Sequence, residues 1–207
     1  FRPDFIAKQI ELKPGYEFSQ DKFSKTLNNL NKLGVWQNIN IIPRTNDSLK
    51  TIDYFLRLSP AKKQYFSVDL GGRRILKNNK LTLVGVGKVG LYVNFRLRNR
   101  NIGKRAIQLE NTLRTGIEFN DFSKILSNEI TQGNRVTIPW ALTPLRKRFE
   151  KKFNNTRTII AFDLTYVDRF QYSELFTFNT FLGYEWKPKS NVTWQFKPFN
   201  IELTRIR

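Results

Sequence analysis

Residues 88–98 of the chain read KVGLYVNFRLR and carry its clearest structural signal. Apolar side chains occupy every second position from Val89 to Leu97, and small, polar or basic side chains occupy the positions between them. Because successive side chains of a β-strand point to opposite faces of a sheet, this alternation predicts a strand with one apolar face and one polar face. The run also reaches the roughly 9–11 residues that a strand needs to cross a bilayer.

The same alternation recurs over the rest of the chain beyond residue 64. About seven runs can be read, at residues 65–70, 89–97, 107–119, 136–140, 157–169, 176–186 and 192–196. A soluble β-sandwich also alternates, with one face of each sheet on its core, and is the alternative. Run length favours membrane strands, as do aromatic side chains near the run ends, at Tyr166, Phe170, Tyr184, Trp186 and Trp194. We therefore expect residues 63–207 to form antiparallel transmembrane strands, part of a β-barrel.

Residues 1–62 have a different pattern and are expected to form a small α+β domain. Pro3 suits the first turn of a short helix, Ser19 suits the N-cap of a second, and Gly34 can end that second helix. Residues 35–42 and 49–58 are expected as two strands, joined by a turn over residues 43–47. The expected order is helix, helix, strand, strand.

Composition narrows the function further. The 207 residues contain no histidine and no cysteine, which removes the commonest general base, thiolate nucleophiles, disulfides and nearly all zinc sites. We therefore expect no enzyme, no cofactor and no metal. The chain contains no methionine and begins at Phe1, so we expect a piece of a longer protein. The net charge of +19 calls for an anionic neighbour, either nucleic acid or an anionic membrane or lipopolysaccharide surface.

Two local motifs have both a functional and a structural interpretation. Residues 85–90 match the dinucleotide-binding pattern G-x-G-x-x-G, but alternation follows where that fingerprint needs a helix, so small residues in a curved strand are favoured. Basic residues at 96–105, with Tyr92 and Phe95, could bind phosphates and bases; a strand end and its hairpin is the favoured interpretation. The basic cluster at 146–152 is expected in a loop. Glu110 and Glu118 are expected as lumen residues paired with Arg114.

Several segments together resemble a known family. Residues 1–15 and the helix ending LNKLGVW, residues 30–36, resemble the last polypeptide-transport-associated (POTRA) domain of the BamA/TamA superfamily of bacterial outer-membrane assembly proteins. LRLSPAKK, residues 56–63, resembles its junction into the barrel. NRNIG, residues 99–103, through Ala106 resembles the turn between the second and third barrel strands, and GYEW, residues 183–186, resembles a later strand. The likeness is greatest to the TamA-like branch of Bacteroidetes.

The resemblance implies a factor in the outer membrane, with its N-terminal domain in the periplasm, that templates insertion or export of client proteins through a barrel seam. The implied seam is the first barrel strand, with residues Tyr65, Phe66, Ser67, Val68, Asp69 and Leu70. Implied partners are outer-membrane lipid and lipopolysaccharide, client outer-membrane or secreted proteins, and periplasmic or lipoprotein partners, with no nucleic acid. The small domain has only two expected strands, so its first strand should offer a free edge to partners at Val35, Trp36, Gln37, Asn38, Ile39 and Asn40.

The chain departs from the family pattern in two ways. A POTRA domain opens with a strand, which is missing here, and the family barrel has roughly sixteen strands where about seven fit here. Two other functions stay open. One is a passive barrel channel or receptor with a periplasmic appendage, and the other is a basic nucleic-acid-binding β protein.

Overall fold

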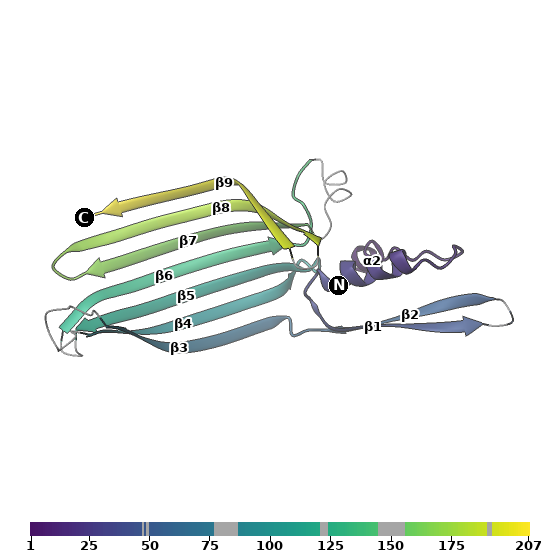
Figure 1. The fold of residues 1–207 in the computed structure, drawn as a ribbon, viewed down its shortest axis with the longest axis horizontal. Coiled ribbons are helices and arrows are strands. Elements are labelled where there is room, and N and C mark those ends of the chain that lie inside the picture. The colour runs from purple at the N-terminus through teal and green to yellow at the C-terminus, as the bar shows by residue number, and fades with distance from the viewer. Residues whose placement is uncertain (47, 49, 77–86, 121–123, 145–155, 190–191) are drawn as a thin grey trace.

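The computed structural model describes residues 1–46, 48, 50–76, 87–120, 124–144, 156–189 and 192–207 (Figure 1). Two helices are followed by nine strands: α1 (Pro3–Ala7), α2 (Gln20–Asn31), β1 (Trp36–Asn46), β2 (Thr51–Pro60), β3 (Gln64–Leu76), β4 (Gly87–Ile102), β5 (Ile107–Asn120), β6 (Lys124–Ile138), β7 (Arg157–Arg169), β8 (Ser173–Lys189) and β9 (Val192–Ile206). β1 and β2 form a hairpin of their own. β3 to β9 form one antiparallel sheet in sequence order.

The two predicted helices are confirmed. Pro3 stands in the first turn of α1, where its missing N–H has no partner to lose. The Ser19 hydroxyl accepts a hydrogen bond from the backbone N–H of Lys22 at 3.5 Å and caps α2. Gly34 has φ +64° just after α2, a conformation that costs glycine little. Among the described residues, no helix is long and apolar enough to cross a membrane.

The turn expected over residues 43–47 is wrong in position. β1 continues through Pro43, which lies opposite Tyr54 in the hairpin, and ends at Asn46. Proline cannot donate to a ladder, but a strand that pairs on one side can carry it where the N–H would point away from the partner. Asp47 and Leu49, which belonged to the expected turn and second strand, lie outside the described residues.

The predicted count of seven strands for the large sheet is confirmed, but five strands (β3, β4, β6, β8 and β9) extend several residues beyond their expected bounds. β3 runs on through Gly71 and Gly72, β6 begins at Lys124, and β9 ends at Ile206. In β3 the two glycines do not end the strand, because β3 pairs with β4 along its full length. In β6 amide side chains take positions where alternation calls for apolar ones, and in β9 Pro198 interrupts the pattern without ending the strand.

A small core joins the N-terminal unit to the sheet. Leu33, Val35 and Ala106 are almost fully buried together, and Phe1, Phe5 and Trp36 pack around them. The side chain of Gln108 in β5 donates a hydrogen bond to the carbonyl oxygen of Leu33 at 3.0 Å. Residues 61–63 are the only covalent link between β2 and β3. The hairpin β1–β2 extends away from the sheet, and α2 lies along it (Figure 1).

Candidate functional site

Cross-strand register sorts the side chains of the large sheet onto two chemically different faces. We call one of them the apolar face. It carries aliphatic and aromatic side chains from every strand: Phe66, Val68, Leu70, Leu91, Val93, Phe95, Leu97, Leu113, Ile117, Ile130, Ile160, Phe162, Leu164, Phe176, Phe178, Leu182, Phe199, Ile201 and Leu203. Many of them are exposed, up to 79% for Leu70. No described helix or strand packs over this face.

An apolar surface of this extent needs a covering. Soluble monomers rarely expose contiguous apolar patches above a few hundred Å², and a sandwich would require a second sheet packed on this face. Among the described residues the only other sheet is the β1–β2 hairpin, which does not pack on it. The strands are 13 to 17 residues long, more than the roughly 9–11 residues that cross a bilayer. The face therefore has the dimensions and chemistry of a lipid-facing barrel wall.

The opposite face, which we call the polar face, holds ion pairs and hydroxyl contacts. Arg98 Nε donates to the Glu110 carboxylate at 2.6 Å, and Arg96 Nε lies 3.9 Å from the same carboxylate. The hydroxyls of Thr131 and Thr165 lie 3.2 Å apart. Such a face suits water better than lipid.

The predicted pairing of Glu110 and Glu118 with Arg114 is wrong. Glu110 lies directly opposite Arg98 and pairs with it, and Glu118 accepts a hydrogen bond from the Ser127 hydroxyl at 3.0 Å. Arg114 shares strand β5 with both glutamates, four positions from each, which is about 13 Å along a strand. Its guanidinium instead lies 4.6 Å from the centre of the Tyr92 ring.

The structure does not support residues 96–105, with Tyr92 and Phe95, as a site that binds phosphates and bases. Tyr92 lies on the polar face and Phe95 on the apolar face, so their rings cannot stack on the same bases. The favoured strand-and-hairpin interpretation is confirmed, since β4 ends at Ile102 and a turn follows. Gly87 to Gly90 lie in β4 rather than at a helix start. Gly85, Val86 and the basic cluster at 146–152 lie outside the described residues.

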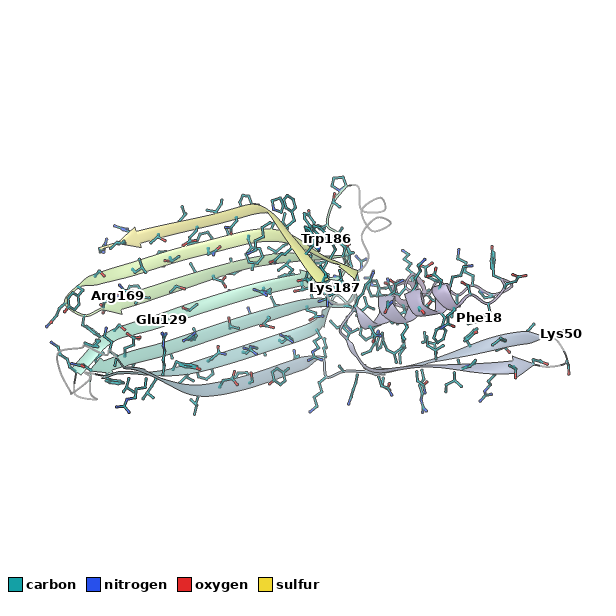
Figure 2. All side chains as sticks on the ribbon, viewed as in Figure 1. Phe18, Lys50, Glu129, Arg169, Trp186 and Lys187 are labelled. Atoms are coloured by element: carbon teal, nitrogen blue, oxygen red, sulfur yellow. The ribbon has the colours of Figure 1, made fainter. Side chains whose placement is uncertain are left out.

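Aromatic side chains gather at both ends of the sheet. Trp186 and Trp194 stack with ring centroids 6.4 Å apart at the end beside the N-terminal unit (Figure 2). Tyr166, Phe170 and Tyr172 are exposed near the other end, where Figure 2 also places Arg169. Two aromatic belts separated by an apolar band are typical of membrane barrels.

The predicted seam residues, Tyr65 to Leu70, lie in β3 at one edge of the large sheet. With 13 residues, β3 is together with β7 the shortest strand of the sheet, and it pairs with β4 from Gln64 to Leu76. Tyr92 also covers Gly71, because a Cβ atom added to Gly71 would lie 2.2 Å from the Tyr92 ring. β3 is therefore firmly held on the β4 side, and within the described residues its other side has no strand partner.

The second predicted site maps onto the hairpin of the N-terminal unit. Trp36, Gln37, Asn38, Ile39 and Asn40 lie in β1, which pairs only with β2 among the described residues. Val35 precedes the strand, is 2% exposed, and its carbonyl oxygen accepts a bond from Ala61 N at 2.9 Å. Val35 therefore belongs to the junction core rather than to a free edge, and Gln37 and Asn40 are exposed.

Two hollows were not foreseen from the sequence. A cavity of about 530 Å³ on the apolar face lies over Gly72 and is lined by Leu70, Leu91, Val93 and Ile117. A groove of about 890 Å³ separates residues 10–18 from β2 in the N-terminal unit. Gly72 is the one residue in the sequence that could have indicated the first of these hollows, because it has no side chain to fill the space. The described residues hold no group of three histidine, cysteine, aspartate or glutamate side chains that could bind a metal ion.

None of the protein-family models matches the chain, and no curated protein matches it. Among solved structures, the chain is similar to the crystal structure of BamA from Haemophilus ducreyi lacking POTRA domains 1–3, with a TM-score of 0.40 and 10% sequence identity. The match covers 100% of this chain and 46% of that chain, so this chain spans less than half of its length. At this identity and TM-score, the similarity assigns neither a family nor a function to the chain.

Proposed function

We propose that the chain is part of an outer-membrane β-barrel protein that helps to assemble or export other proteins, and that it is not an enzyme. The observation that carries the membrane part is the exposed apolar face, which runs across all seven strands of one sheet opposite a polar face. Lipid can cover the first face and a watery lumen can hydrate the second. A strand wall satisfies its own backbone hydrogen bonds in lipid once the barrel is closed.

The N-terminal unit is placed in the periplasm in this proposal and is taken as POTRA-like. Its two helices and the β1–β2 hairpin support that assignment, and so does its attachment at the end of the sheet where Trp186 and Trp194 stack. The link from β2 to β3 is only residues 61–63. A client bound to the small unit would therefore be delivered close to the first barrel strand.

The assembly function would work through backbone templating at β3. The strand has 13 residues, one paired side and one side without a partner among the described residues. Unpaired N–H and C=O groups of an edge strand add an incoming strand by main-chain hydrogen bonds. Alternation in β3, with Phe66, Val68 and Leu70 on the apolar face, sets the register in which an incoming strand would match it.

Site-specific photocrosslinking in growing cells tests this function. A photoreactive residue at Asp69, on the polar face of β3, is expected to capture identified outer-membrane or secreted precursors. The same residue at Thr177, on the polar face of the internal strand β8, is the matched control and should capture none. Equal capture at both positions, or none at Asp69 in a folded membrane-inserted protein, would contradict templating at β3.

A passive channel is the second candidate, favoured by the ion pairs and threonine contacts on the polar face. It predicts steady conductance in planar bilayers and no precursor capture at Asp69. A nucleic-acid-binding protein would instead stay soluble without detergent.

A further inference from the structure

One strip of the apolar face is not apolar. Gln132 and Asn134 stand on the outward face of β6, and Asn111 stands on the same face of β5, directly opposite Asn134. Their neighbours on adjacent strands are apolar: Gln132 lies between Leu113 and Leu164. We call Asn111, Gln132 and Asn134 the amide strip.

The amide strip lies in the middle of the sheet rather than at its ends. Gln132 is within about one residue of the centre of β6, which spans Lys124–Ile138. Asn128 of the same strand lies beside Asp168, close to the end of β7, and so belongs to the rim. The strip therefore sits at the depth where lipid tails would surround it.

The amides are incompletely satisfied within the described residues. Asn111 Nδ2 donates to Asn134 Oδ1. Asn134 Nδ2 is enclosed and has no hydrogen-bond partner among the described residues. The Gln132 side chain is exposed, and no hydrogen bond from the described residues reaches its amide. Lipid tails supply neither donors nor acceptors, so a protein surface that offers both would be preferred at the exposed Gln132 amide.

We propose that the amide strip is the contact by which two copies of this protein associate side by side in the membrane. The proposal rests on the proposed membrane function. A two-fold axis along the membrane normal brings each residue of the strip opposite its own counterpart at equal depth. A carboxamide carries both donors and an acceptor and can pair with itself, whereas carboxylates or ammonium groups would repel their own copies.

The apolar side chains around the amide strip also suit contact with a second copy of the protein. The side chains of Leu113, Ile130 and Phe162 are 44%, 42% and 43% exposed on the apolar face next to it. They would pack against the same residues of the second copy and exclude lipid from the amides. The strip contains three carboxamides and no charged group, which is the composition that self-pairing needs.

Cysteine crosslinking of the full-length protein in native outer membrane tests the proposal. The sequence contains no cysteine, so Gln132→Cys would introduce the only thiol of this part of the protein. Mild oxidation is expected to give a disulfide-linked homodimer through Gln132→Cys. Phe95→Cys is the matched control: it lies near the middle of β4 on the same face, two strands away, and should remain monomeric.

A second measurement separates pairing from mere proximity. Gln132→Leu should raise the dimer dissociation constant in detergent at least tenfold, and Gln132→Asn should raise it less. Monomer at all accessible concentrations, or equal crosslinking through Gln132→Cys and Phe95→Cys, would overturn the proposal. Capture of a different, identified membrane protein through Gln132→Cys would also overturn it. Failure of the membrane function itself shows separately, as a protein that stays soluble without detergent.

Discussion

The contact between Tyr92 in β4 and Gly71 in β3 holds the edge strand β3 in register with its neighbour. A Cβ atom at Gly71 would come within 2.2 Å of the Tyr92 ring, whereas one at Gly72 would be 3.7 Å from its nearest neighbour. An aromatic ring that covers a glycine of the neighbouring strand shields its bare backbone and pins the register of the two strands.

We predict that Gly71→Ala destabilises the protein by about 1–3 kcal/mol, because the ring must be displaced. Gly72→Ala is the control and should change stability by about 0.5 kcal/mol or less. Urea unfolding in detergent measures both, and hydrogen exchange should show faster exchange in β3 for the first variant. Equal effects of the two substitutions would argue against the ring as the feature that holds β3.

Position along the strand decides the cost of a charge on the apolar face. Leu164 lies at the middle of β7, which spans Arg157–Arg169, whereas Leu91 lies nearer to one end of β4. We predict that Leu164→Arg costs about 2–4 kcal/mol in lipid and that Leu91→Arg costs less. Asn94→Arg, on the polar face, should be mild. Folding titrations into lipid vesicles measure the three variants, and similar costs for Leu164→Arg and Asn94→Arg would rule out lipid on the apolar face.

At the scale of strands, the β1 edge that has no strand partner among the described residues leads to a prediction about partners. Asn40 is exposed in β1, and its cross-strand neighbour Arg57 is exposed in β2. A photoreactive residue at Asn40 is expected to capture an identified client or periplasmic partner by strand addition to the β1 edge. The same residue at Arg57 should capture less. Preferential capture at Arg57 would move the binding edge to β2.

Strands could be predicted from the sequence where one face of the strand is apolar and the other polar. They were missed where both faces carry polar side chains. The central part of β4 was predicted, because apolar and polar side chains alternate from Val89 to Arg98. Most of β6 was missed, because the outward-facing Gln132 and Asn134 are polar like the flanking Thr131 and Arg135 on the opposite face. The Arg98–Glu110 pair could not be foreseen, since it depends on the register that the turn between β4 and β5 imposes.

At the scale of the whole molecule, that turn also fastens the N-terminal unit to the sheet. Ala106 is fully buried between Leu33 and Val35 with φ +58°, and its backbone N–H donates to the Asn101 side chain at 3.0 Å. The backbone N–H of Arg2 donates to the carbonyl oxygen of Lys104 at 3.3 Å. The expected likeness of residues 99–106 to a barrel turn gave no hint that this turn carries part of the interface.

We predict that Ala106→Leu loosens this attachment while leaving the sheet folded. A larger side chain does not fit beside Leu33 and Val35, and overpacking of this kind costs about 1–3 kcal/mol. Ala106→Gly should be close to neutral, because glycine adopts a positive φ without strain and removes only one methyl group. Arg105→Leu, at an exposed position of the same turn, is the control for a changed turn sequence.

Spin labels at Lys25 on α2 and Lys124 on β6, both exposed, would report the attachment as an electron–electron distance distribution. The distribution should broaden for Ala106→Leu and stay narrow for Ala106→Gly and Arg105→Leu. If β3 receives clients from the N-terminal unit, client assembly should fall together with the broadening, because the unit no longer presents clients at a fixed position beside that strand. A narrow distribution for Ala106→Leu would show that the buried alanine does not set the orientation of the unit. Broadening with full assembly would show that a fixed orientation is not needed for delivery to β3.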